Sequence, residues 1–195
     1  MARVPLLTPD DLPDADRQII WRRGNLYRAL ANSPEFAATF ATYGFWLNTR
    51  SSLSNRIQEL VILKVASIHG SRFEWSAHVG MSLSKQILSE VEVEAIAVGA
   101  EQSVESINSL EQVLLAMVDK KLKFKAVDDA DAQYVIENQG QKFFVEFAGL
   151  VGMYIGLAHL IDLLAIDVAC NEQGWDQRFP LPNYSDDCHQ LAEDE

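Results

Sequence analysis

The sequence predicts an all-α protein that folds as a single-domain helical bundle. Apolar residues recur at helical spacing along most of the 195-residue chain, which is the pattern of helices that bury one face. Strand signals are weak, because no Asn-Gly or Asp-Gly turn occurs and alternation is rarely sustained. A chain of this length supports one substantial core and is short for two full domains.

The expected organisation is an N-terminal arm over residues 1–14, a helical core over 15–170 and an irregular tail over 171–195. The tail is inferred from a change in composition, with glycine, prolines and a run of acidic residues. Helices are expected at residues 15–30, 34–47, 55–69, 71–88, 90–98, 110–122, 129–138 and 141–170.

Local start and stop signals justify these boundaries. Ser33 before Pro34 is a typical helix start, and Ser54 can cap the next helix. Gly70 marks the end of that helix. Two stretches have the spacing of a capping box, Ser89 to Glu92 and Ser109 to Gln112. Asp128 is expected to cap the helix that ends before Gly140, after which the long apolar helix begins.

Composition excludes some classes of partner. The chain has 16 basic and 28 acidic residues, a formal net charge of −12. Because phosphate binding needs a basic surface, we expect neither a nucleic-acid partner nor an anionic membrane surface. The N-terminus lacks the apolar segment of a signal peptide, so we expect a cytoplasmic protein. Cys170 and Cys188 form no C-x-x-C or zinc pattern, and no disulfide framework is expected.

The apolar stretch 147–161, followed by Asp162, is shorter than the roughly 20 residues that cross a membrane. We therefore expect no membrane span. We expect a helix buried almost all round, either in the core of the subunit or in a subunit interface.

Glu59, Glu74 and His78 are the residues most suggestive of chemistry. Glu74 and His78 are four residues apart and share a helix face. Glu59 lies on the preceding helix, and the break at residues 69–71 can fold the two helices together. Two carboxylates and an imidazole would then converge, and such a group can move protons.

Other interpretations of these residues remain open. Glu59 could form a surface ion pair with Arg56, and Glu74 with His78 could be an ordinary helix-surface pair. Trp75 could wall a site or belong to the core. Glu74 and His78 could also ligate a metal with Glu59 or His69 as a third ligand, although no H-E-x-x-H motif is present.

These residues resemble a known family. The segment 73–78 (Phe-Glu-Trp-Ser-Ala-His), just after a Gly-Ser turn, is similar to the signature of the carboxymuconolactone decarboxylase family in the alkyl-hydroperoxidase D-like superfamily. Segments 25–34 and 144–154 also fit, so the resemblance spans roughly residues 15–170. It implies an all-helical fold of the alkyl-hydroperoxidase D-like type and a homo-oligomer, commonly a trimer or hexamer. It implies no cofactor or metal.

In the peroxidase branch of this superfamily a Glu is followed by C-x-x-C and then a His. Ser71 and Glu74 occupy the two cysteine positions here. Without a thiolate there is no sulfenic acid and no disulfide cycle, so thiol peroxidase activity is not expected.

The resemblance instead implies a decarboxylase-like lyase that acts on a small carboxylated lactone or a related metabolite. His78 would donate the proton, Glu59 would orient or recharge it, and Glu74 would complete the relay. Arg56 or Lys64 would hold the substrate carboxylate, and Trp75 would line the site. A non-catalytic oligomeric ligand-binding protein and a Glu/His metal-dependent enzyme are the alternatives.

Overall fold

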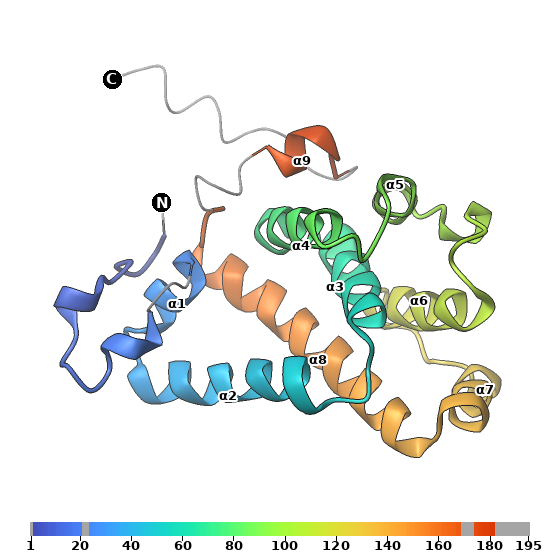
Figure 1. Ribbon diagram of the computed structural model, residues 1–195, viewed down its shortest axis with the longest axis horizontal. Helices are drawn as coiled ribbons and strands as arrows, with labels where there is room; N and C mark the ends of the chain where they lie inside the picture. The colour runs from blue at the N-terminus through green and yellow to red at the C-terminus, as the bar shows by residue number, and fades with distance from the viewer. Residues whose placement is uncertain (1, 21–23, 169–173, 182–195) are drawn as a thin grey trace.

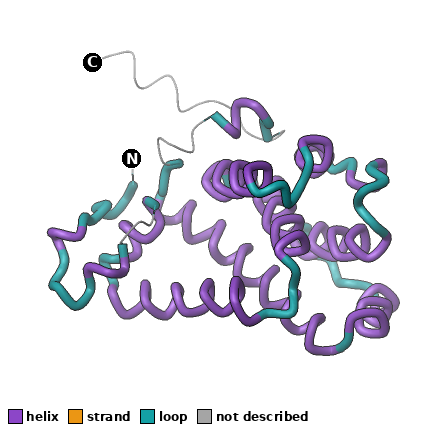
Figure 2. Tube along the Cα trace, viewed as in Figure 1, coloured by secondary structure: helices purple, strands orange, loops and turns teal. Residues whose placement is uncertain are grey.

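The expected all-α fold is confirmed. The computed structural model describes residues 2–20, 24–168 and 174–181, and within them no strand occurs (Figures 1 and 2). The α-helices are α1 (Asn25–Leu30), α2 (Pro34–Arg50), α3 (Asn55–His69), α4 (Arg72–Ser84), α5 (Glu90–Val98), α6 (Ser109–Leu122), α7 (Asp129–Gln139), α8 (Gln141–Leu164) and α9 (Trp175–Arg178). Short 3₁₀ turns cover Pro9–Asp11, Arg17–Ile19 and Glu101–Ser103.

Helix α3 is the centre of the molecule. Every residue from 58 to 67 is buried, although the run contains Gln58, Glu59 and Lys64. It packs against α4, α5, α6 and α8, so its polar side chains must find partners inside the protein. Figure 1 shows α3 and α4 in the middle, with α1 and α2 on one side and α5, α6 and α7 on the other.

Three apolar clusters surround this helix. One joins α3 to α6 and α8, and it includes Leu114, Val118 and Leu150. A second lies between α3, α4 and α5 around Trp75. The third packs the N-terminal segment against the last turns of α8. The side chains of α3 thus contribute to both of the first two clusters.

Helices α2 and α8 each leave a large part of their surface exposed to solvent. In the 17 residues of α2 only Ala37 and Leu47 are buried. One face of α8 is exposed along most of its length, through Val145, Gly152 and Leu163. The expected burial of residues 147–161 on all sides is therefore not achieved within one subunit.

Among the described helices, only α8 is long and apolar enough to cross a membrane, by length and composition alone. A core helix of a soluble protein passes the same test, so the finding is weak evidence for a span.

The chain ends differ from expectation. Residues 15–30 do not form one helix, because α1 begins only after Gly24, whose backbone is extended; glycine has a low helix propensity. Helix α8 ends at Leu164, since Ala165 adopts the left-handed conformation. Part of the expected irregular tail is ordered: α9 packs on α4, and Phe179 is buried beyond it. Cys170 and Cys188 lie outside the described residues.

Most of the internal boundaries follow the predicted caps. The Ser54 hydroxyl accepts a hydrogen bond from the amide of Ile57, and Ser89 with Glu92 forms the expected capping box. Ser33 and Asp128 occupy the N-cap positions of α2 and α7 without a side-chain cap bond. The α6 box is one residue earlier than expected, because its N-cap is Asn108 and not Ser109.

Candidate active site

The α3–α4 turn positions the candidate residues. Gly70 ends α3 with φ of 79°, a left-handed conformation that glycine adopts without strain. Helix α4 starts two residues later and packs directly on α3. Glu59 on α3 therefore faces the α4 side that carries Glu74 and His78.

The structure brings Glu59, Glu74 and His78 together around the imidazole ring. His78 Nδ1 lies 3.0 Å from Glu59 Oε2, and His78 Nε2 lies 3.4 Å from Glu74 Oε2. The Ser82 hydroxyl donates a further hydrogen bond of 2.8 Å to Glu59 Oε2. Glu59 thus pairs with His78, and the alternative surface pair with Arg56 does not form. The catalytic role of the three residues remains a prediction.

The site is nearly enclosed. The side chain of His78 is 14% exposed, and those of Glu59 and Glu74 are 6% and 5% exposed. Burial lowers the pKa of His78, but hydrogen bonds and negative charge from Glu59 and Glu74 outweigh burial and raise it to about 10. At neutral pH the ring is therefore an imidazolium held between two carboxylates.

Tyr154 of α8 is a neighbour of this site that the sequence reasoning missed. Its ring meets the His78 ring edge to face, with centroids 5.6 Å apart and an interplanar angle of 84°. Burial, followed by the charges of Glu74 and Glu59, raises the pKa of Tyr154 well above its usual value. No sequence spacing links Tyr154 to α4, since the contact depends on how α8 packs.

Arg56 and Lys64 are not brought to the imidazole. The Arg56 guanidinium pairs with Glu92 at 2.6 Å and Glu111 at 2.8 Å, which ties α3 to α5 and α6. Lys64 pairs with the buried Glu101 at 2.5 Å. Both cations are thus paired with glutamates away from the imidazole, and the expectation that either one holds a substrate carboxylate remains a prediction.

Trp75 belongs to the core. Its side chain is fully buried, and its indole Nε1 donates a 2.8 Å hydrogen bond to the carbonyl of Phe179. The residue packs in the core and anchors the segment after α9, and the expectation that it lines a substrate site remains a prediction.

The described residues do not supply a set of ligands for the alternative in which Glu74 and His78 bind a metal ion. His69 Nε2 lies 3.3 Å from His159 Nδ1 on α8, so His69 pairs away from the triad. In the part of the chain that the structure describes, no group of three His, Cys, Asp or Glu side chains is arranged to hold a metal ion.

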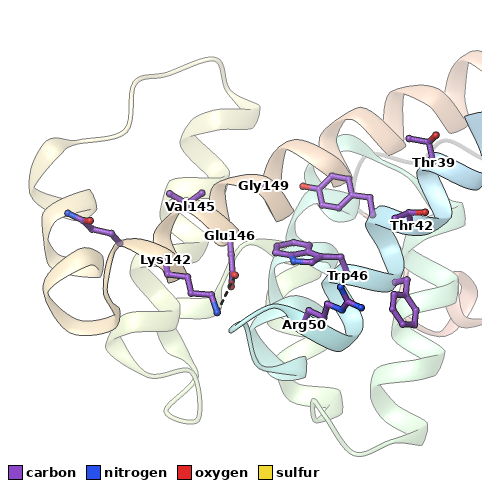
Figure 3. A pocket seen from close by; sticks show the side chains of 11 residues that line it. Thr39, Thr42, Trp46, Arg50, Lys142, Val145, Glu146 and Gly149 are labelled. Carbon is purple, nitrogen blue, oxygen red and sulfur yellow. Dashed lines mark ion pairs between the residues drawn. The ribbon is translucent and has the colours of Figure 1, made fainter.

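A large cavity lies away from the triad. It is a groove of about 1150 Å³ between α2 and α8, which Figure 3 shows from close by. Trp46 and Tyr43 line it from α2, and Val145 and Gly149 from α8, with Arg50 and Lys142 also on its wall. Glu59, Glu74 and His78 do not line this groove.

Known structures share this fold. An uncharacterized peroxidase-related protein from Ralstonia eutropha with an alkylhydroperoxidase AhpD core has a TM-score of 0.73 at 16% identity, covering 88% of this chain and 94% of its own. A peroxidase-related protein from Silicibacter has a TM-score of 0.71 at 17% identity, covering 88% and 93%. The debrominase Bmp8, a cysteine-to-alanine variant in complex with 2,3,4-tribromopyrrole, has a TM-score of 0.76 at 13% identity, covering 92% and 98%.

The class defined by fold and site is therefore an AhpD-like helical protein with a carboxylate–imidazole centre. Residues 34–116, which include all three candidate residues, match the model of the carboxymuconolactone decarboxylase family. This match covers less than half of the chain, and the solved structures share its AhpD-like helical fold. A comparison with curated proteins finds no significant match.

Proposed function

We propose that this protein is a decarboxylase-like lyase that acts on a small carboxylated lactone or a related keto acid by proton transfer. One observation carries the proposal: the His78 ring is held by Glu59 at 3.0 Å and Glu74 at 3.4 Å in a nearly enclosed site. Burying two carboxylates costs free energy unless they are paired, and this pairing keeps the His78 ring protonated as a localised proton source. The family name points to the lactone class.

The chemical step needs a proton donor and no redox group. Cleavage of the bond to the departing carboxylate releases CO2, and the bonding electrons delocalise onto the conjugated carbonyl oxygen as an enolate. His78 then gives its proton to the carbanionic carbon, and solvent restores the proton by way of Glu59 or Glu74. Ser71 and Glu74 stand where the peroxidase branch has cysteines, so a thiol cycle has no nucleophile here.

The test is turnover of 4-carboxymuconolactone and a panel of small lactones and keto acids, followed by CO2 release. His78→Gln should lower kcat by roughly 10²–10⁴-fold, the range for loss of a general acid. His159→Gln is the matched control, because this histidine is exposed on α8 and does not contact the triad. Equal activity of His78→Gln and wild type, with circular dichroism unchanged, would refute the proposal, as would a wild type inactive on the whole panel.

A second candidate is a non-catalytic oligomer that binds a ligand. The observation that favours it is the large apolar groove between α2 and α8, which Glu59, Glu74 and His78 do not line. In that case ligand binding would be unaffected by His78→Gln and would be lost on Trp46→Asp in the groove.

We also propose that the protein is a homo-oligomer. Support comes from the sparse burial of α2 and from the bare face of α8, where a side chain added at Gly152 or Gly156 would meet no atom within 4 Å. Exposed Phe36, Phe45 and Leu163 extend this apolar surface. Light scattering at micromolar concentration tests the proposal, and a monomeric mass would overturn it.

A further inference from the structure

The hydroxyl of Tyr154 is a hydrogen-bond donor on a partly buried side chain, and no described residue engages it. Its ring is wedged between two of the apolar clusters and meets His78 edge to face. Within the described part of the chain, Tyr154 has the ring contact with His78 and no hydrogen bond. A phenol hydroxyl beside a site that no described residue engages is available to donate to a ligand atom.

The phenol keeps its proton under all ordinary conditions. Burial disfavours the phenolate, and the negative charges of Glu74 and Glu59 disfavour it further, so the pKa of Tyr154 lies well above that of a free tyrosine. The group therefore acts as a neutral hydrogen-bond donor and not as a base.

The other polar groups at the triad are already engaged. The Ser82 hydroxyl donates to Glu59, and the two nitrogens of His78 face the two carboxylates. When His78 passes its proton to carbon, a separate donor is needed for the oxygen on which the electron pair has accumulated. The Tyr154 ring packs against the ring that delivers the proton, so its hydroxyl is the candidate for this second donor.

We propose that Tyr154 is a catalytic residue whose hydroxyl donates a hydrogen bond to the substrate carbonyl oxygen that becomes the enolate oxygen. This inference rests on the proposed decarboxylase-like function. Cleavage of the carbon–carboxylate bond sends its electron pair through the conjugated system to that oxygen. Tyr154 keeps its proton and stabilises the charge, and His78 supplies the proton that the carbon receives.

The assignment also narrows the class of substrate. Two carboxylates flank the imidazole, and Arg56 and Lys64 are committed to other glutamates. The site is therefore suited to read a neutral carbonyl, such as that of a lactone or ketone, next to the carboxylate that leaves. The carbonyl must be conjugated with the bond that breaks, because otherwise no charge develops at the Tyr154 hydroxyl.

The experiment compares wild type with Tyr154→Phe, which keeps the ring and removes only the hydroxyl. We expect kcat/KM to fall by roughly 10²–10³-fold, the loss found when one oxyanion donor is removed. The pH profile should keep its shape, because His78 and its two carboxylates remain in place. The urea midpoint should change little, because the hydroxyl bonds to no described residue. Tyr134→Phe, on the partly exposed surface of α7, is the matched control and should retain full activity.

The outcomes separate this inference from the proposed function. If Tyr154→Phe retains wild-type activity while His78→Gln is inactive, the function stands and the role of Tyr154 is overturned. If Tyr154→Phe recovers full activity at a shifted pH, the residue acts through His78 and not on the substrate, which also overturns the role. A wild type inactive on every compound of the panel overturns the proposed function and this inference together.

Discussion

Raising the pH should destabilise the protein through the loss of one proton from His78. The pKa of His78 in the folded protein is about 10, against 6.5 for the free side chain. The folded state therefore binds one proton more than the unfolded state in this interval, and stability falls as pH rises through it. The stabilisation is fully present below about pH 6.5 and is lost by the time the pH has passed about 10.

The size of the effect follows from the same two values. Each pH unit in which the folded state holds the extra proton corresponds to about 1.4 kcal/mol. From pH 6.5 to about 10 the loss amounts to roughly 5 kcal/mol. That is comparable with the whole free energy of unfolding of a marginally stable domain.

Urea denaturation at half-unit pH steps and constant ionic strength measures this loss. Lysines and tyrosines titrate in the same range, so the relevant quantity is the stability of wild type minus that of His78→Gln at each pH. This difference should be largest at pH 6.5 and shrink steadily toward pH 10. Two stability curves that run parallel over the whole range would show that His78 is not the protonated centre described above.

Two further substitutions test the framework around the site. Arg56→Met leaves the buried carboxylates of Glu92 and Glu111 without their cation and should lower the free energy of unfolding by about 3 kcal/mol in urea titrations; a change below 0.5 kcal/mol would show that the pairs contribute nothing net. Gly70→Ala forces a side chain into a φ of 79° and should cost about 1 kcal/mol, whereas an unchanged or raised melting temperature would contradict the left-handed cap.

The site could be predicted where its geometry depends on local chemistry. Ser54 and Gly70 fix the two ends of α3, and the four-residue spacing puts Glu74 beside His78 on one helix. The remaining requirement was that α4 fold back on α3, which the short break between them makes almost unavoidable. For this reason the sequence was sufficient to place Glu59 next to the imidazole.

Features that depend on long-range packing could not be predicted in this way. Asn108 and Ser109 are both good N-caps, and each has a Glu or Gln three residues later. The structure uses Asn108 with Glu111, and Glu111 also accepts from Arg56 on α3. The sequence offers two equivalent capping boxes, one starting at Asn108 and one at Ser109. The box that forms is the one whose glutamate also contacts a distant helix. Tyr154 is a similar case, since only the packing of α8 places it at the site.

The carboxylate of Glu74 bears on whether a reaction at this site begins or ends with a proton transfer. A thiol at that position could give its proton to a neutral imidazole, whereas a carboxylate there holds the ring in its charged form together with Glu59. With a pKa of about 10, about one His78 in a thousand is neutral at pH 7. A reaction that begins with proton abstraction by His78 would therefore be slow, because the neutral imidazole is almost never present. A reaction that begins by breaking a bond without a base, and ends by receiving a proton, suits the imidazolium as it stands. Loss of CO2 followed by protonation of an enolate has this order, and the reverse order, as in an isomerase that first removes a proton, does not.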